Sequence, residues 1–523
     1  MDMFIKLAFL VVFFGVMVGI GLYCRKHTTD VNGFVLGGRA VGPWLTAFAY
    51  GTSYFSAVVF VGYAGQFGWK YGIAATWAGI GNALLGSLLA WVVLGRRTRV
   101  MTQHLDSATM PQFFENRFQS RSLKLAASAI IFIFLIPYTA SLYNGLSRLF
   151  GMAFHVDYAV CVIAMAVLTG VYVIAGGYMA TAINDFIQGI IMIVGIIAVV
   201  GAVLKSQGGF LAALDGLARV SDPTVSDTPG VFASFFGPDP VGLLGVVLLT
   251  SLGTWGLPQM VQKFYAIRSE KAIDKGTIIS TVFAAIVAGG CYFLGGFGRL
   301  FSDQVDVAAN GYDSIVPTML EGLSTVLIAV VVILVLSASM STLSSLVLAS
   351  SSTLTLDFIK DTIVKDMDEK RQILTMRLLI VVFIAISVVL AIVQYRSNVT
   401  FIAQLMGVSW GALAGAFLAP FLYGLYWKKT TRGACWVSFL FSTVVMLANI
   451  FFGKYFPTLL QSPINAGAFC MLAGLIIVPV VSLVTPRLPQ GQIDRIFACY
   501  DRKVVVSVKD SIGDHTNPKE ETP

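Results

Sequence analysis

The sequence predicts an all-α polytopic membrane protein with about thirteen transmembrane helices, and three observations support this. Hydrophobic residues make up 57% of the 523 residues and charged residues only 12%, whereas soluble domains carry about 25% charged residues. Apolar runs of about 20 residues recur along nearly the whole chain, and each is long enough to span a bilayer as a helix. The runs lack the period-2 alternation of barrel strands. A helix also satisfies every backbone polar group inside lipid.

Charged and turn residues set the ends of the predicted helices. In chain order the runs are roughly 4–23, 42–68, 73–95, 122–152, 157–176, 178–204, 240–262, 276–301, 322–354, 374–395, 399–427, 433–452 and 465–485. The first run lacks the basic flank and the cleavage site of a signal peptide, so we expect it to remain as a transmembrane helix. After residue 485 the apolar periodicity ends, which predicts a short amphipathic piece followed by disorder.

The basic residues predict the orientation. With the N-terminus outside, 27 of the 35 Lys and Arg residues fall in cytoplasmic loops or in the C-terminal tail. Such an excess is typical of cytoplasmic loops, so we expect the N-terminus outside and the C-terminus inside. Lys263, directly after the run 240–262, is counted with these loop residues. The formal charge of +8 is spread over short loops, so we expect no nucleic-acid partner.

The sequence does not indicate an enzyme. Its six Cys and four His residues are scattered, without metal-ligand spacing, so we predict neither a disulfide framework nor a zinc site. It offers no paired carboxylates and no nucleophile with a base beside it. The predicted helices also leave no segment for a soluble catalytic domain.

Two of the runs are interrupted in their middle. Residues 51–56 (GTSYFS) place a glycine and hydroxyl cluster within the run 42–68, and residues 253–258 (GTWGLP) interrupt the run 240–262. If the helix unwinds there, backbone carbonyls become free. Paired Gly/Pro interruptions in two halves of a chain predict a transporter built from inverted repeats, with its binding site near the bilayer midplane.

Polar side chains inside membrane helices are costly, so those present are candidate functional residues. Asp185 is the only charged residue of the run 178–204, and it is either solvated at the cytoplasmic interface or a ligand for a cation or proton. Four serines of the run 322–354 share one helical face; they are Ser337, Ser341, Ser344 and Ser345. This face either allows tight helix packing or supplies hard oxygen ligands to an alkali cation.

Three motifs lie in order on the predicted helices. They are FVLGGR at 34–39 followed by GP at 42–43, GGYMATAINDFIQ at 176–188, and ASMSTLSS at 338–345. The motifs resemble the entry to the first core helix, the fifth core helix and the eighth core helix of the sodium:solute symporter family, which includes bacterial proline, pantothenate and sialic acid transporters. The resemblance covers nearly the whole chain, and it implies a multi-pass protein of a bacterial-type plasma membrane.

The resemblance also implies a LeuT-type core of two inverted repeats with five helices each. On this basis the chain divides into a peripheral first helix with a cytoplasmic loop (1–41), a first repeat (42–205), an extracellular loop (206–239), a second repeat (240–427), two C-terminal transmembrane helices (428–485) and a cytoplasmic tail (486–523).

The resemblance further implies Na+ as the coupling ion. In the family, one Na+ binds carbonyls of the first core helix and the carbonyl and hydroxyls of the eighth, which correspond here to Thr52, Phe55, Ala338, Ser341 and Thr342. A second Na+, found nearer the cytoplasm in some members, corresponds to Asp185, Ser341, Ser344 and Ser345. We therefore predict two Na+ per cycle. Asp185→Asn should keep the fold, because it removes a buried charge.

Solute contacts are expected from the interruptions and the helices beside them. The candidates are Tyr54, Ser56, Gln66, Tyr138, Trp255 and Gln404, and packing is the alternative role of each aromatic ring. The proline transporters carry Asp where this chain has Tyr54, and this difference argues against proline as the solute. A tyrosine at this position is similar to the pantothenate-type branch of the family. Since no Lys or Arg is expected near the middle of a run, a solute carboxylate would meet helix N-termini, hydroxyls or bound Na+.

The predicted function is sodium-coupled secondary active import of a small organic solute by alternating access. Amino acids, pantothenate and monocarboxylates are the solute classes that the resemblance implies. A proton-coupled transporter of the same fold, with Asp185 as the carrier, and a membrane sensor without transport are the alternatives. The expected partners are the solute and the lipid bilayer, and the sequence leaves the oligomeric state open.

Overall fold

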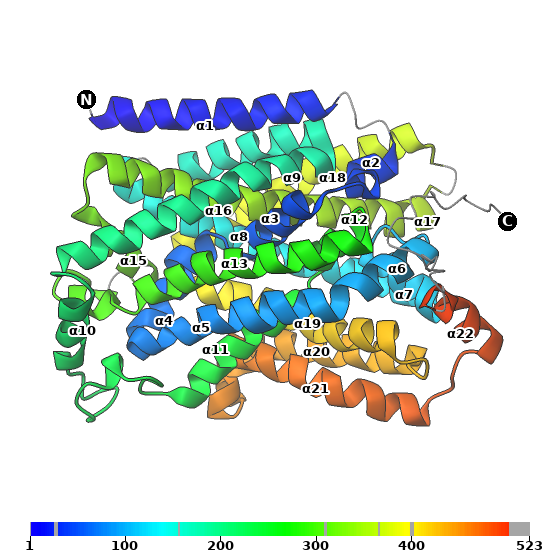
Figure 1. The fold of residues 1–523 in the computed structure, drawn as a ribbon. Coiled ribbons are helices and arrows are strands. Elements are labelled where there is room, and N and C mark those ends of the chain that lie inside the picture. Colours follow the sequence, from blue (N-terminus) through cyan, green and yellow to red (C-terminus); the bar gives the residue numbers. More distant parts are fainter. Residues whose placement is uncertain are drawn as a thin grey trace, which may run out of the picture.

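The computed structural model shows a bundle of helices that run side by side along one direction (Figure 1). It describes residues 2–25, 30–154, 157–307, 311–364, 367–397 and 402–500. Strands are absent from these ranges, where two isolated bridges join Val41 to Ile267 and Asp222 to Ser226. The all-α class predicted from the apolar runs is confirmed.

Nine long helices form most of the bundle in the described part. They are α1 (Asp2–Arg25), α8 (Arg121–Phe154), α9 (Tyr158–Ser206), α13 (Glu270–Gly295), α16 (Thr325–Thr353), α18 (Glu369–Ser397), α19 (Ile402–Tyr426), α20 (Arg432–Phe452) and α21 (Pro463–Val484). Figure 1 shows α1 on one flank of the bundle and α21 on the opposite flank.

Shorter segments build the remaining spans. They are α3 (Pro43–Tyr54), η2 (Val58–Tyr63), α4 (Ala64–Tyr71), η3 (Gly72–Ala75), α5 (Thr76–Gly81), η4 (Asn82–Leu89), η5 (Trp91–Gly95), α11 (Pro240–Leu252), η7 (Gly253–Trp255), α12 (Pro258–Ala266) and η10 (Leu354–Ile359). The other short elements are α2 (Val31–Leu36), η1 (Gly37–Arg39), α6 (Arg96–His104), α7 (Met110–Phe118), α10 (Phe210–Arg219), η6 (Val231–Ala233), η8 (Gly298–Phe301), η9 (Tyr312–Ser314), α15 (Ile315–Glu321), α17 (Lys360–Thr362), η11 (Gly453–Tyr455), η12 (Thr458–Leu460), α22 (Gln490–Phe497) and η13 (Ala498–Tyr500).

Ten helical stretches of the described chain are long and apolar enough to cross a membrane, or eleven if the bent pair α11–α12 counts as one span. Two of the ten, 58–104 with 47 residues and α9 with 49 residues, are about twice as long as one crossing requires. In α9 the chain turns at Gly177, with φ 56° and ψ −147°, a backbone conformation that suits glycine. The exact number of crossings stays a prediction.

Close glycine contacts bring some of the helices together. A Cβ atom on Gly68 of α4 would lie 1.8 Å from the carbonyl oxygen of Gly295 on α13, so only glycine fits there. Small residues at such contacts let membrane helices approach closely enough for van der Waals packing. This contact fixes α4, the second half of the interrupted span 42–68, against α13.

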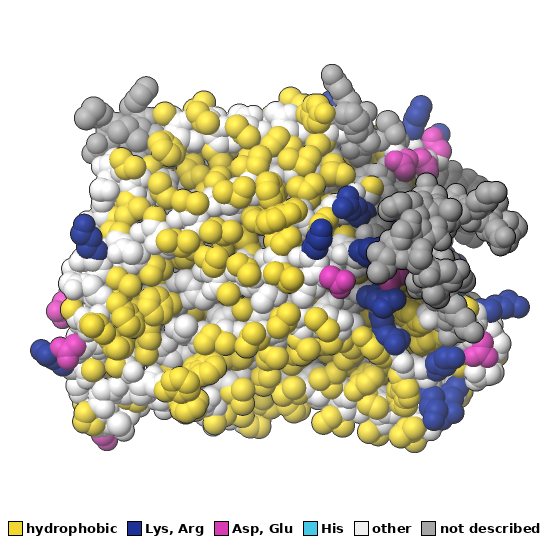
Figure 2. Space-filling view, in the orientation of Figure 1, with side chains coloured by type: hydrophobic (Ala, Val, Ile, Leu, Met, Phe, Trp, Pro, Cys, Tyr) yellow, Lys and Arg dark blue, Asp and Glu magenta, His cyan; other side chains and the backbone are white. Residues whose placement is uncertain are grey.

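The two ends of the bundle differ in charge. Figure 2 shows an apolar middle, with Lys and Arg side chains gathered at the end that holds α6 and α22. We call the end formed by α2, α6, α7 and α22 the basic end. The N-terminal end of α1 lies at the opposite end (Figure 1). The predicted orientation places this basic end in the cytoplasm, and it stays a prediction.

The tail begins as the predicted amphipathic piece. Ile493, Ile496 and Phe497 are buried on one face of α22, while Asp494 on another face pairs with Lys428. Beside α22, Arg117 of α7 donates to the carbonyls of Gly424 and Trp427 at the end of α19. Burial lowers the pKa of Arg117 to about 10, so it stays charged at neutral pH and favourably meets the helix C-terminus. The predicted disorder concerns residues 501–523, which lie outside the described part.

Candidate functional site

The first interruption ends a helix in the middle of the bundle. Helix α3 stops at Tyr54, and Phe55 adopts an extended conformation with φ −102° and ψ 102°. The next helical segment starts after Ser56, whose Oγ accepts a hydrogen bond from the N–H of Val58 at 3.2 Å. The last carbonyls of a helix have no intrahelical partner, so the break leaves polar backbone atoms inside the protein.

Hydroxyl groups of α16 meet one of these carbonyls. Ser341 Oγ and Thr342 Oγ1 each donate to the carbonyl oxygen of Thr52 at 3.1 Å. Both hydroxyls also lie 3.1 Å from the carbonyl oxygen of Ala338. Two carbonyl and two hydroxyl oxygens therefore converge between α3 and α16.

This oxygen cluster is closed to solvent. Thr52, Ser341 and Thr342 are 0% exposed and Ala338 is 2% exposed. Thr52 Oγ1 has no hydrogen-bond partner among the described residues. Because uncharged oxygen atoms are hard ligands, the donor set fits an alkali cation. Four of the five residues predicted for the first sodium site are thus brought together, and Phe55 lies at the break beside them.

Aromatic rings surround the break. The Tyr54 ring stacks on Phe55, with ring centroids 4.2 Å apart, and on Trp410 of α19 at 5.8 Å. Trp410 in turn contacts Tyr138 of α8 edge to face at 5.9 Å. The Tyr54 hydroxyl donates to the carbonyl oxygen of Thr250 on α11. Two predicted solute contacts, Tyr54 and Tyr138, therefore belong to one aromatic cluster.

The second interruption lies against the same cluster. The segment 240–255, which is α11 continued by η7, is bent by 42° against α12 at the break between them. A Cβ atom on Gly253 would lie 2.4 Å from the Trp410 ring, so this glycine gives room to the tryptophan. The predicted contact Trp255 points elsewhere, and its Nε1 donates to the carbonyl oxygen of Leu85 at 3.0 Å. The two breaks thus meet through Trp410.

The remaining predicted solute contacts lie at different depths. Ser56 is in the break itself, whereas Gln66 is buried on α4, ten residues further along the chain. Gln404 is half-buried near the start of α19, about 9 Å along the helix axis from Trp410. The structure therefore groups Tyr54, Ser56 and Tyr138 more closely than Gln66 and Gln404.

A small cavity adjoins the break. Phe55, Ser56 and Ala338 line it together with side chains of α9, α13 and α16, and its volume is about 10 Å³. That is close to the space that one water molecule needs and too small for an organic solute. Ser56 is the predicted solute contact that lines this cavity.

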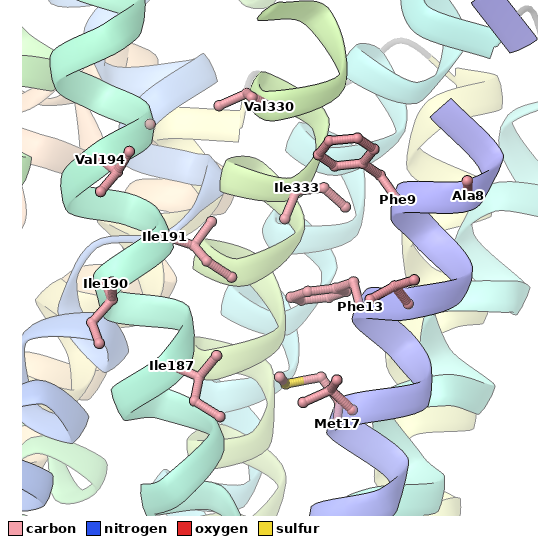
Figure 3. Close-up of a pocket in the computed structure, with 13 residues that line it drawn as sticks. Ala8, Phe9, Phe13, Met17, Ile187, Ile190, Ile191, Val194, Val330 and Ile333 are labelled. Carbon is pink, nitrogen blue, oxygen red and sulfur yellow. The ribbon is translucent and has the colours of Figure 1, made fainter. Parts of the chain in front are cut away.

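A larger groove lies on the outer surface of the bundle. It holds about 630 Å³ between α1, α9 and α16, and Figure 3 shows its apolar lining, which includes Phe13 and Ile191. All its lining residues are apolar or glycine, whereas ligand sites contain a few convergent polar groups. This groove suits lipid chains better than a polar solute.

The residues predicted for the second sodium site lie around a lysine. Nζ of Lys263, on α12, donates to Ser345 Oγ at 3.0 Å and lies 3.9 Å from Asp185 Oδ2. The Asp185 side chain is 0% exposed and that of Lys263 is 3% exposed. The interpretation of Asp185 as a solvated interface residue is therefore wrong. The placement of Lys263 in a cytoplasmic loop is also wrong, because α12 carries it into the bundle.

The two other residues of the second predicted site have different partners. Ser341 binds the Thr52 carbonyl, as described above, and Ser344 Oγ donates to the Ser341 carbonyl of its own helix at 2.9 Å. Ser345 Oγ lies 2.7 Å from Ser53 Oγ. Of the predicted second set, Asp185 and Ser345 each lie close to Nζ of Lys263.

Sequence reasoning missed Trp410 and Lys263. Trp410 lies in a run that is apolar throughout, so its contact with both breaks depends on how α19 packs. Lys263 follows the apolar run directly, and counting charges assigned it to a loop. The sequence did hold a signal for the buried lysine, because a lone Asp185 in an apolar run needs a counter-charge. Lys263 could supply it, since it lies within α12, five residues after the start of that helix.

The interrupted helices, the oxygen cluster at the α3 break and the many apolar helices together define a cation-coupled membrane transporter. A model of the sodium:solute symporter family matches residues 34–441. The chain belongs to this family, and it is a sodium-coupled symporter of a small solute rather than an enzyme.

Named relatives cover almost the whole chain. The osmoregulated proline transporter OpuE of Bacillus subtilis (strain 168) is 28% identical over 91% of this chain and 94% of its own length. The sodium/proline symporter of Staphylococcus aureus (strain JH9) is 27% identical over 91% of both chains. These relatives are bacterial transporters, in agreement with the predicted multi-pass location in a membrane.

Two solved structures share the fold. A Na+-coupled sialic acid symporter in a substrate-bound outward-open state matches with a TM-score of 0.72 and 17% identity, over 93% of this chain and 99% of that chain. Mhp1, a nucleobase-cation-symport-1 family transporter in a closed conformation, matches with a TM-score of 0.50 and 15% identity, over 88% and 97%. At these identities the likeness establishes the LeuT-type fold alone, as predicted.

Proposed function

We propose that the protein imports a small zwitterionic solute, such as an amino acid, together with Na+ bound at the junction of α3 and α16. The observation that carries this proposal is the double contact of Ser341 and Thr342 with the Thr52 carbonyl. The proposed ligands are Thr52, Phe55, Ala338, Ser341 and Thr342. All of them offer uncharged oxygens to a small hard cation.

The position of this site explains how Na+ would drive transport. A ligand shifts a conformational equilibrium only if it binds the two states differently. The proposed ligands come from two elements, α3 and α16, which we assign to the first repeat (42–205) and the second repeat (240–427). When these helices separate, the cation loses about half of its oxygens. Sodium therefore favours the state in which they touch.

The solute class follows from the charges near the breaks. The proposed solute contacts are Tyr54, Ser56, Gln66, Tyr138, Trp255 and Gln404, to which we add Trp410, and none of them is ionisable at neutral pH. A solute with a net charge would need a counter-charge in this buried region. A zwitterion has no net charge: helix N-termini can meet its carboxylate, and the faces of aromatic rings such as Trp410 can meet its ammonium. The relatives named above as proline transporters support an amino acid.

The test is uptake by purified protein in proteoliposomes. An inward Na+ gradient at fixed pH should drive accumulation of a zwitterionic amino acid, and a proton gradient without Na+ should not. Pantothenate, monocarboxylates and sialic acid are tested as competitors on the same preparation. Uptake driven by protons alone would favour the proton-coupled alternative. Preferential competition by an anionic solute would contradict the proposed solute class.

A further inference from the structure

A lysine lies where the sequence predicts a second cation. Asp185 and Ser345, two of the four residues predicted for the second sodium site, both lie close to the same ammonium group. Nζ of Lys263 lies between them, 3.0 Å from Ser345 Oγ and 3.9 Å from Asp185 Oδ2. The ammonium group therefore lies beside two of the four residues predicted to bind a second Na+.

The pair is enclosed by protein. Both carboxylate oxygens of Asp185 lack a hydrogen bond in the described part of the chain, and the ammonium of Lys263 is the opposite charge beside them. The Lys263 Nζ also lies 5.1 Å from the centre of the Tyr178 ring, a distance typical of a cation–π contact. A buried carboxylate and a buried ammonium each need a counter-charge, and here each provides it to the other.

A mobile cation would compete with this ammonium. A second Na+ bound to Asp185 would lie within a few ångströms of Nζ, and like charges repel strongly where water does not screen them. Lys263 is anchored by α12, so it cannot leave the site as an ion can. The geometry does not fit a second Na+ while Lys263 remains in place.

We infer that Lys263 replaces a second Na+ as the fixed counter-charge of Asp185, so that the protein binds and carries one Na+ per cycle. The inference rests on the proposed function, because the single ion is the one at Thr52. The proposed Na+ and the Lys263 ammonium lie at the same contact between α3 and α16. Ser345 of α16, which accepts from Lys263, is hydrogen-bonded to Ser53 of α3, and Ser53 is the neighbour of Thr52. A fixed charge adds no ion to the cycle, so the driving force is that of one Na+.

The experiment counts Na+ on the purified full-length protein by equilibrium binding of radioactive Na+, with K+ to keep the ionic strength constant. The wild type should bind one Na+ per molecule. Lys263→Ala leaves Asp185 open to a mobile ion, so this variant should bind two Na+ per molecule. The Hill coefficient for the Na+ dependence of its uptake should rise from one toward two. Lys263→Arg keeps the charge and serves as the matched control, with one Na+ expected.

A second variant removes the binding group that the extra ion would use. Asp185→Asn in the Lys263→Ala background should bring the count back to one. If Lys263→Ala does not fold, the double variant Asp185→Asn/Lys263→Gln takes its place, because neither charge is then left buried alone. We expect one Na+ per molecule on this double variant and one on the wild type. The charge moved per zwitterionic solute in proteoliposomes should likewise be one for the wild type.

The outcomes separate this inference from the proposed function. Two Na+ on the wild type, or a folded Lys263→Ala variant that still binds one, overturns the inference and leaves the first site standing. A wild type that binds no Na+ overturns the proposed function, and with it the inference.

Discussion

Removal of one hydroxyl at the α3–α16 junction should weaken sodium binding without unfolding the protein. In Ser341→Ala the Thr52 carbonyl loses one of its two hydroxyl partners and keeps Thr342, which also lies at 3.1 Å. No buried backbone oxygen is therefore left without a partner. The change removes about one neutral hydrogen bond, which contributes about 1 kcal/mol to stability.

The effect on the ion should be larger than the effect on the fold. An interaction between a polar group and a charge contributes about 1.5–3 kcal/mol, and about 1.4 kcal/mol corresponds to a factor of ten in affinity. Ser341→Ala and Thr342→Ala should each raise the half-saturating Na+ concentration by about 10- to 100-fold. With both changes together, Na+ activation should be lost over the usable concentration range.

The assay is initial uptake against Na+ concentration, combined with Na+-dependent thermal stabilisation of the purified variants. Ser339→Ala is the matched control, because Ser339 is on the same helix and its hydroxyl donates to the Val335 carbonyl of that helix at 2.8 Å. It should keep the wild-type Na+ response. If both Ser341→Ala and Thr342→Ala also keep that response, the sodium site is wrongly placed.

Two further predictions concern the solute and the basic end. Tyr54→Phe removes the hydroxyl that donates to Thr250 and should change the ranking of competing solutes more than the half-saturating Na+ concentration; an altered Na+ response with an unchanged ranking would contradict this. Arg117→Ala removes the hydrogen bonds to the Gly424 carbonyl of α19 and to the Trp427 carbonyl just after it, and it should cost about 2–4 kcal/mol, measured as a lower melting temperature. The control is Arg96→Ala. Arg96 forms an exposed ion pair with Glu270, so this change should cost less than about 1 kcal/mol. If both variants lose the same stability, Arg117 does not stabilise the end of α19 as described.

The all-α class could be predicted from the sequence because it depends on local patterns, and the first sodium site stays a prediction whose proposed ligands the structure brings together. Apolar length alone identifies a membrane helix, and hydroxyls three and four residues apart share one face of it. Ser341 could therefore be placed on a serine face with Ser337, Ser344 and Ser345, whereas Thr342 entered the predicted site only through the family resemblance. That Ser341 and Thr342 face Thr52 followed from the resemblance to a known family, and the structure agrees with it.

What could not be predicted depends on packing between distant segments. The location of Lys263 depends on how far α12 continues after its break and on which helix lies opposite. Charge counting treats every lysine after an apolar run as a loop residue, since isolated lysines are rarely buried. Trp410 shows the same limit: its contact with Gly253 joins two helices that are more than 150 residues apart.

The lysine also reverses the expected effect of Asp185→Asn. If Asp185 were alone, removing its charge would relieve a penalty and the variant would keep its stability. Since Lys263 lies 3.9 Å away and is buried, the substitution instead leaves an ammonium without its counter-charge. Breaking a buried ion pair from one side typically costs about 3–5 kcal/mol.

A double-mutant cycle measures this coupling. Asp185→Asn and Lys263→Gln should each destabilise the protein by about 3 kcal/mol, whereas the variant with both changes should lose clearly less than the sum, because it buries two neutral polar groups instead of one charge. The readout is the melting temperature in detergent without Na+, so that ion binding does not enter the comparison. Additive losses would mean that the two charges do not interact, and the assignment of Lys263 as the partner of Asp185 would have to be abandoned.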